Sequence, residues 1–140
     1  MDMPTIDSIP WSSLEHAYGS AADASKYLHD LAHGNEDEID EAVYGFLHSS
    51  ACHQYTTYSS TPYVVRYVIN LLSSDLLLIE QTSEILGFIY ACTFSAKDKE
   101  LLKSEIVNGS ACFKKYLKHS DPKVVENAKK LLVFCGENSA

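Results

Sequence analysis

The residues best suited to chemistry lie in one polar stretch, HSSACHQYTTYSSTP, from His48 to Pro62. His53, Gln54, Tyr55 and Tyr58 have side chains that serve in other proteins as acids, bases or hydrogen-bond donors. No nucleophile elbow, catalytic carboxylate pair or phosphate-binding glycine loop accompanies them in the chain. We therefore predict that the protein is not an enzyme and that this stretch connects two pairs of helices.

A structural role for the same residues follows from their position between two apolar, helix-like segments. His53 and Gln54 are expected to cap helix ends, and a binding role on the rim between two repeats is the alternative. They are also expected to pack against residues near the amino terminus, namely Trp11, His16 and Tyr18.

Metal binding is the second chemistry to consider. The four cysteines, at positions 52, 92, 112 and 135, form no CxxC pair. Among the histidines only His29 and His33 stand four residues apart on one helix face, and no third ligand lies near them in the sequence. We expect a solvated histidine pair, reduced and mostly buried thiols, and neither a metal nor a cofactor.

Negative charge is concentrated in the first half of the chain. Of the formal net charge of −8, all arises in residues 1–70, which contain ten acidic and two basic residues, whereas residues 71–140 contain nine of each. The run EDEIDE, from Glu36 to Glu41, places five carboxylates in six positions. Because such a surface repels nucleic acid and attracts basic proteins, we expect no nucleic-acid partner.

Helical periodicity runs along most of the chain, and even YVVRYVINLL has its apolar residues at helical rather than alternating spacing. A serine cap, a first-turn proline and Gly19 predict a short helix from Pro10 to Tyr18. No apolar run approaches the roughly 20 residues that span a membrane, and the first residues lack a secretory signal. We expect a cytoplasmic protein without a membrane partner.

The later helices repeat one pattern, in which a helix, a short break with Asn or Asp and a second helix follow one another. The breaks HGNEDE, LLSSDLL and KHSDPK place Asp37, Asp75 and Asp121 at intervals of 38 and 46 residues, within the range of two-helix solenoid repeats. We predict one all-α domain, residues 1–140, with an amino-terminal cap (1–19) and helix pairs at 20–50, 61–95 and 98–136. A plain helical bundle is the alternative.

Two segments resemble a known family. The closing FKKYLKHSDPKVVENAKKLL resembles a HEAT repeat, in which an Asp-Pro break and a following Val lie between paired helices. The earlier PWSSLEHAYGSAADASKYLHDL and CHQYTTYSSTPYVVRYVINLL look like small bacterial HEAT-like proteins that often read HAYGSA and then HQG. Tyr55 stands where that pattern has its glycine. The resemblance implies a right-handed α-solenoid of about three HEAT-like helix pairs.

The same resemblance suggests a function. Small bacterial HEAT-like and other all-α proteins occur as immunity proteins of contact-dependent or polymorphic toxin systems, which implies that this chain neutralises a cognate toxin by binding it. A nuclease toxin with a basic substrate channel would suit an acidic binding face. The expected partner is therefore a basic protein, bound by a monomer.

The acidic run and its surroundings form the predicted partner-binding site. If the second helix of each pair faces the concave side of a solenoid, Glu80 and Glu84 occupy on the second pair the place of the acidic run on the first. The predicted binding residues are Glu36, Asp37, Glu38, Asp40, Glu41, Glu80 and Glu84, with Tyr44, Tyr55 and Tyr58 as anchors.

Two other functions remain open at this point. One is a helical-repeat scaffold that joins two proteins. The other is a HEAT-like nucleic-acid-processing enzyme, which would need a lysine-lined groove built from Lys114, Lys115, Lys118, Lys129 and Lys130.

Overall fold

The computed structural model describes residues 6–74 and 79–138, with Ile79 and Glu80 described by their backbone alone. Its α-helices are α1 (Ala24–His33), α2 (Glu36–Asp40), α3 (Thr61–Ser73), α4 (Ile79–Ala96), α5 (Glu100–Asn108), α6 (Ser110–Lys115) and α7 (Pro122–Asn138). Helix α2 continues directly into the π-helical segment η4 (Glu41–Ala51). Short 3₁₀ turns are η1 (Ile6–Ser8), η2 (Trp11–Ser13), η3 (Ala21–Asp23) and η5 (Tyr116–Lys118). The chain is mostly helical, which confirms the all-α prediction.

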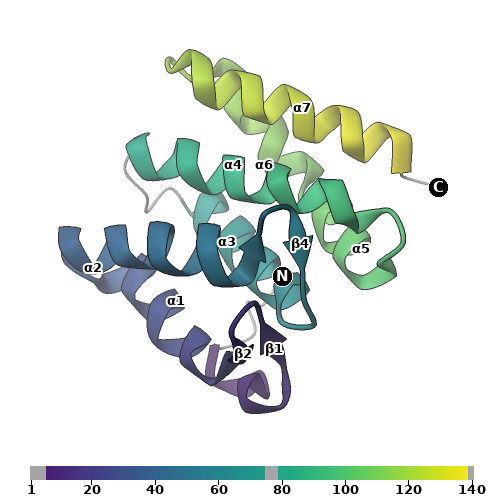
Figure 1. Ribbon diagram of the computed structural model, residues 1–140. Helices are drawn as coiled ribbons and strands as arrows, with labels where there is room; N and C mark the ends of the chain where they lie inside the picture. The colour runs from purple at the N-terminus through teal and green to yellow at the C-terminus, as the bar shows by residue number, and fades with distance from the viewer. Residues whose placement is uncertain (1–5, 75–78, 139–140) are drawn as a thin grey trace.

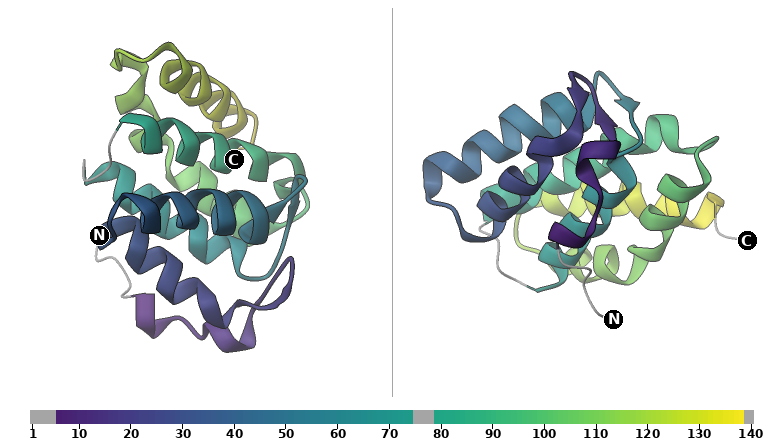
Figure 2. Two further views of the ribbon diagram at one scale, coloured as in Figure 1. Left: turned by 60° about the vertical axis from the view of Figure 1, so that its left-hand side comes forward. Right: turned by 90° about the horizontal axis from the view of Figure 1, so that it is seen from below.

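The helices form two layers (Figure 1). Helix α2 with η4, helix α4 and helix α7 lie side by side in one layer, and α1, α3 and α5 lie behind them (Figure 2). The apolar faces of both layers meet in one core. Its largest fully buried side chains include Phe46, Phe88, Phe113, Leu28, Leu72 and Leu86.

Local signals place the helix that begins at Glu36. The Asn35 side chain accepts a hydrogen bond from the Glu38 amide at 2.9 Å, and the Glu38 carboxylate accepts one from the Asn35 amide at 2.9 Å. This capping box satisfies two amides that the first turn leaves without helical partners. Gly34 stands just before it, in extended backbone with a φ of −73°. A Cβ there would lie 2.7 Å from the Asp30 carbonyl oxygen, so the close approach of α1 and α2 requires glycine.

The predicted helix from Pro10 to Tyr18 is wrong. Only Trp11–Ser13 is helical, as the 3₁₀ turn η2, and the chain then forms a hairpin of strands β1 (Glu15–His16) and β2 (Gly19–Ser20). Gly19 has a φ of +117°, which glycine adopts without strain but which closes no helix here. A residue outside the hairpin stabilises it, because the Ala17 amide donates a hydrogen bond to the Ser50 carbonyl at 2.9 Å.

A second hairpin with a two-residue turn joins η4 to α3. Strands β3 (Cys52–His53) and β4 (Thr56–Thr57) pair around the two-residue turn Gln54–Tyr55, as β1 and β2 pair around Ala17–Tyr18. Both turns read His-x-Tyr. Gln54 and Tyr55 have φ values of 49° and 68°, a left-handed conformation that a type I′ turn requires and that glycine or asparagine usually supplies.

Candidate functional site

A groove runs between the α2–η4 helix and α4 at the end where α2 begins. Its volume is about 300 Å³, and its lining residues are Gly34, Glu36, Ile39, Asp40, Val43, Tyr44, Gln81 and Glu84. Three carboxylates therefore share the groove with apolar and aromatic surface. The structure brings together four of the predicted binding residues here: Glu36, Asp40, Tyr44 and Glu84.

Helix geometry explains the wall on the α2–η4 side. Glu36, Asp40, Tyr44 and His48 stand four residues apart, so they follow one face of a continuous helix. The hydrogen bonds at the end of η4 reach five residues back, as in the bond from the Cys52 amide to the Leu47 carbonyl. The Tyr44 side chain is 58% exposed, and its ring stacks on that of His48 with centroids 6.2 Å apart.

The opposite wall belongs to α4. Glu84 Oε2 lies 3.3 Å from Nε2 of His48, within range of an ion pair across the two helices when the imidazole is protonated. The same Nε2 atom is closed off from solvent and makes no hydrogen bond, because its contact with Glu84 is close but not aligned. The His48 ring also meets Phe88 edge-on, with centroids 6.3 Å apart. His48 thus lies at the back of the groove. It was not among the residues predicted from the sequence, although its spacing from Asp40 and Tyr44 indicates the same helix face.

The other predicted acidic residues lie elsewhere. Glu38 is engaged in the capping box with Asn35. The Glu41 carboxylate lies over Gly45, where a Cβ would come within 2.4 Å of its Oε1 atom. Asp37 is exposed and does not line the groove. The side chain of Glu80 lies outside the described residues.

The two remaining tyrosine anchors are not in the groove. The Tyr55 ring is 4.8 Å from that of Phe94 near the end of α4, and Phe94 in turn is 5.3 Å from Tyr90. Tyr55 and Phe94 are both more than half exposed. We call Tyr55, Phe94 and Tyr90 the aromatic row. Tyr18, at the tip of the first hairpin, is also more than half exposed but contacts the His53 ring instead.

Tyr58 lines a different hollow, of about 550 Å³, beside the amino-terminal end of α5. Leu14, Tyr63, Lys99 and Leu101 line it as well. The Lys99 ammonium donates to both the carbonyl and the hydroxyl of Thr57, each at 2.8 Å, and so ties the second hairpin to α5.

The polar stretch from His48 to Pro62 is held by specific hydrogen bonds. His53 Nδ1 lies 3.1 Å from the Ser49 carbonyl, which only accepts, so Nδ1 carries the proton. Thr61 donates to the Ala51 carbonyl at 2.6 Å, and Ser60 donates to the Glu15 carbonyl at 2.7 Å. The predicted packing of His53 against Tyr18 is confirmed by an edge-on ring contact at 5.8 Å. These bonds close helix ends and join the two hairpins.

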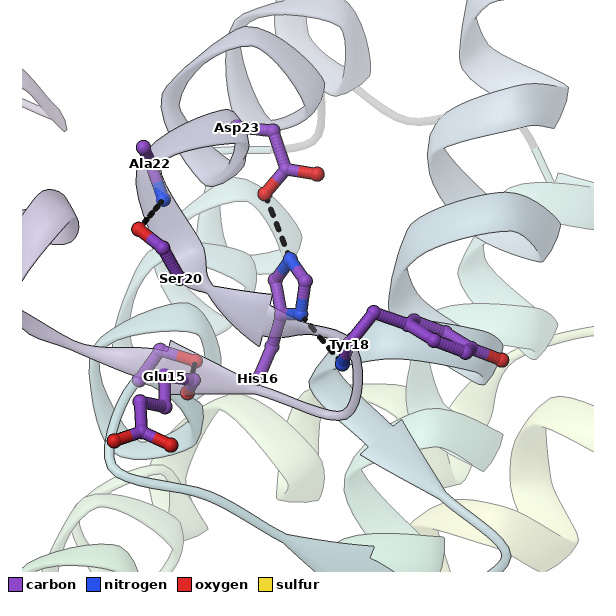
Figure 3. Close-up of polar contacts among 7 residues, drawn as sticks. Glu15, His16, Tyr18, Ser20, Ala22 and Asp23 are labelled. Carbon is purple, nitrogen blue, oxygen red and sulfur yellow. Dashed lines mark hydrogen bonds and ion pairs between the residues drawn. The ribbon is translucent and has the colours of Figure 1, made fainter.

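His16 resembles a catalytic base at first sight because its Nε2 lies 2.8 Å from a carboxylate oxygen of Asp23 (Figure 3). The Tyr18 amide donates to His16 Nδ1 at 3.1 Å, so Nε2 must carry the proton and donate to Asp23. Both ring nitrogens are thereby engaged in a buried side chain. His16 orders the first hairpin, and the Tyr18 ring lies edge-on to the His16 ring with centroids 6.3 Å apart (Figure 3).

No group of three or more potential metal ligands occurs among the residues that the structure describes. His29 lies 3.4 Å from Asp7, and His33 is exposed at the end of α1. The prediction of buried thiols is confirmed for all four cysteines.

The thiol environments differ. Burial raises the pKa of Cys92 well above its ordinary value, while a hydrogen bond from Cys92 lowers the pKa of Cys52. Burial raises the pKa of Cys135 to about 11. Cys52 is nevertheless only 4% exposed, which keeps bulky reagents away from its sulfur.

Three of the five lysines that a nucleic-acid groove would require have different surroundings. Lys114 and Lys130 line different hollows. Lys115 donates to the Leu72 carbonyl at the end of α3 at 3.3 Å, and the Lys130 ammonium stands 5.1 Å from the centre of the Tyr90 ring. Lys114 and Lys130 therefore do not line one groove together.

Comparison with protein-family models, curated proteins and solved structures finds no match to this chain. The proposed function therefore rests on the chemistry of the groove. Within residues 6–74 and 79–138, no helix combines the length and the apolar character needed to cross a bilayer.

Proposed function

We propose that the protein is a binding module that takes a basic protein partner into the groove between α2–η4 and α4. The supporting observation is the convergence of Glu36 and Asp40 on one helix with Glu84 on another, around apolar surface from Ile39 and Val43. Among the residues that the structure describes, no lysine or arginine lines the groove. A partner's cations would therefore meet carboxylates that no described lysine or arginine of the lining neutralises, beside an apolar floor.

The fold supports a repeated arrangement of helices. Helix α1 packs on α2–η4, and α5 and α6 pack on α7. Helix α4 packs on η4 and α7, while α3 packs mainly on α5 and only slightly on α4. We infer a right-handed α-solenoid of about three HEAT-like pairs, in which the second helices supply the binding face. The acidic groove then lies between the second helices of the first two pairs.

The partner that best fits is a cognate toxin, in particular a nuclease whose active-site channel is basic. Carboxylates at the mouth of a groove compete with phosphates for such a channel, and opposite charges accelerate the encounter. The chain would then be an immunity protein.

Co-expression with the product of the gene immediately upstream tests this proposal. We expect a stable complex in size-exclusion chromatography and loss of the partner's nuclease activity or toxicity. A partner that stays fully active in the complex would contradict the immunity role.

Two double variants test the surface. Glu36→Gln with Asp40→Asn removes two groove carboxylates, and Asp37→Asn with Asp98→Asn removes two exposed carboxylates that do not line it. The first should weaken binding by about tenfold, roughly 1.4 kcal/mol. The second should change it less than about twofold, because exposed charges outside the contact contribute little. Equal effects would remove the groove from the interface.

A scaffold that joins two proteins is the second candidate, and the aromatic row favours it. Tyr55 and Phe94 expose large rings in contact with each other beyond the groove, and exposed apolar clusters of this kind mark interaction surfaces. Replacing Tyr55 and Phe94 by serine separates the two functions, since a scaffold would keep the groove partner and lose another.

A further inference from the structure

We propose that Cys52 and Cys92 form a peroxide-sensitive thiol pair, in which hydrogen peroxide oxidises Cys52 and the product condenses with Cys92 to a disulfide. The new bond joins the second hairpin to α4. Neither cysteine is among the described residues that line the acidic groove, so the thiol pair is independent of the proposed function.

The packing of the second hairpin brings the two cysteines together. This hairpin lies against the second half of α4 (Figure 1). Cys52 on β3 and Thr57 on β4 are directly paired, so their side chains lie on the same face of the hairpin. The Thr57 and Ser95 hydroxyls share a hydrogen bond at 2.7 Å, so this face is turned towards α4. Cys92 stands one helical turn before Ser95, and a hydrogen bond joins its thiol to that of Cys52.

Three groups stabilise a negative charge on the Cys52 sulfur. The Cys92 thiol donates a hydrogen bond to it, and the Tyr55 amide, at the turn of the hairpin, donates another. The Lys99 ammonium supplies a positive charge from a fixed position, because it donates to the Thr57 carbonyl and hydroxyl, each at 2.8 Å. These groups lower the pKa of Cys52, the Cys92 hydrogen bond most of all, although burial opposes them.

The two thiols differ in exposure in the way that the reaction requires. Cys52 is 4% exposed, which excludes bulky oxidants but admits hydrogen peroxide, a molecule of nearly the size of water. Cys92 is fully buried, and the only partner it needs is the oxidised sulfur beside it. Burial raises the pKa of Cys92 well above its ordinary value, so Cys92 holds its proton while Cys52 reacts.

The reaction proceeds in two balanced steps. The Cys52 thiolate attacks one oxygen of hydrogen peroxide, the O–O bond breaks, and the leaving hydroxide takes the proton that Cys52 released. Cys52 is then a sulfenic acid. The Cys92 sulfur attacks the Cys52 sulfur, the S–O bond breaks, and the leaving hydroxide takes the Cys92 proton. The thiols together lose two electrons to the peroxide, which becomes two molecules of water.

Cys112 and Cys135 provide a comparison within the same chain. They are 8% and 5% exposed, slightly more than Cys52, so exposure alone would make them react first. Their thiols donate to backbone carbonyls, Cys112 to Ile69 at 3.8 Å and Cys135 to Ile106 at 3.6 Å. Because the thiolate is the form that peroxide oxidises, we expect Cys52 to react at least about tenfold faster than either of them.

Brief treatment of the intact natural protein with hydrogen peroxide tests the thiol pair. The remaining thiols are blocked under denaturing conditions, and mass spectrometry of the digested chain identifies the linked residues. We expect the intact chain to lose two hydrogens and to give one linked pair of peptides, containing Cys52 and Cys92. Any other first product would overturn the proposal. A chain that keeps all four thiols at a peroxide dose that oxidises a cysteine-containing peptide would overturn it as well.

Three variants assign the roles of the cysteines. In Cys92→Ser the sulfenic acid has no thiol to meet, so dimedone added with denaturant after the peroxide should label Cys52. Cys52→Ser should give no label at position 92, and Cys112→Ser should form the disulfide at the natural rate. Circular dichroism reports whether each variant is folded. Dimedone label on Cys92 in Cys52→Ser would overturn the choice of Cys52 as the residue that peroxide attacks.

The pH dependence of disulfide formation tests the charge of Lys99. Lys99→Gln removes a positive charge that favours the thiolate, so the pH at which the rate is half maximal should rise. Lys129→Gln, which removes an exposed charge from α7, should leave that pH unchanged. An equal pH profile for Lys99→Gln and the natural protein would overturn the electrostatic role of Lys99 at this site.

Discussion

Nε2 of His48 lies 3.3 Å from Oε2 of Glu84, which brings the fourth turn of the α2–η4 helix against the first half of α4. The contact positions Glu84 at the groove although that nitrogen atom lacks a hydrogen bond and lies away from solvent. Leaving a buried polar atom unsatisfied costs about 1–3 kcal/mol. The contact therefore contributes to the arrangement of the site more than to stability.

Replacing His48 by phenylalanine tests whether the contact with Glu84 contributes to stability. The ring contacts with Tyr44 and Phe88 are retained and the unsatisfied nitrogen is removed, so we expect stability to be unchanged or higher by up to about 1 kcal/mol. His48→Ala loses the packing as well and should be less stable than the natural protein by about 1 kcal/mol. Urea denaturation measures both, and a strongly destabilised His48→Phe would show that the imidazole is needed.

The Arg66–Glu105 pair joins α3 to α5. The Arg66 Nε atom donates to Glu105 at 2.8 Å, its second guanidinium nitrogen contacts the same oxygen, and Glu105 is only 11% exposed. This hydrogen bond also raises the pKa of Arg66. Glu105→Gln should cost about 1–2 kcal/mol. Glu100→Gln, which loses an exposed pair with Lys103, should cost less than about 0.5 kcal/mol in the same denaturation experiment.

The second hairpin stores backbone strain at Gln54, whose φ is 49°. A non-glycine residue in this conformation destabilises the folded state by roughly 1–2 kcal/mol. Glycine removes that strain, but its greater freedom in the unfolded chain destabilises the folded state by about 0.5–1 kcal/mol. Gln54→Gly should therefore raise stability by about 0.5–1 kcal/mol. Thr56→Gly, in the neighbouring strand, should lower it. A lower melting temperature for Gln54→Gly would show that Gln54 is not strained in the folded protein.

Cys135 makes stability depend on alkaline pH. Burial raises its pKa to about 11, and the positive charge of Lys114 opposes that rise. The unfolded thiol titrates near 8.5, so the folded state holds a proton that the unfolded chain releases first. This contribution is complete below about pH 8.5 and is lost as the pH rises towards 11. Because burial also raises the pKa of Tyr67, the comparison must be made between variants.

Denaturation curves of the natural protein and Cys135→Ala between pH 7 and 11 isolate the contribution of Cys135. The variant should be less stable at neutral pH because it loses buried packing, and its stability should decline less steeply above pH 9. Parallel curves throughout the range would show that the Cys135 thiol does not drive the alkaline loss.

The sequence by itself determined the helical class, the break between α1 and α2, and the concentration of acid on α2. These features depend on local hydrogen bonding and on side-chain periodicity, which a few neighbouring residues control. The four-residue spacing of Glu36, Asp40 and Tyr44 likewise places them on one helix face. The division into helix pairs at 20–50, 61–95 and 98–136 stays a prediction.

Only the tertiary structure decided which predicted residues meet. It brought Glu84 to the groove and His48 behind it, turned Glu41 over Gly45, and placed Tyr55 and Tyr58 on separate surfaces. It also made hairpins of two segments that bond to residues distant in sequence, as the Ala17 amide does to the Ser50 carbonyl. Such contacts depend on how whole helices pack around a shared core, and the pattern along a single segment does not contain that information.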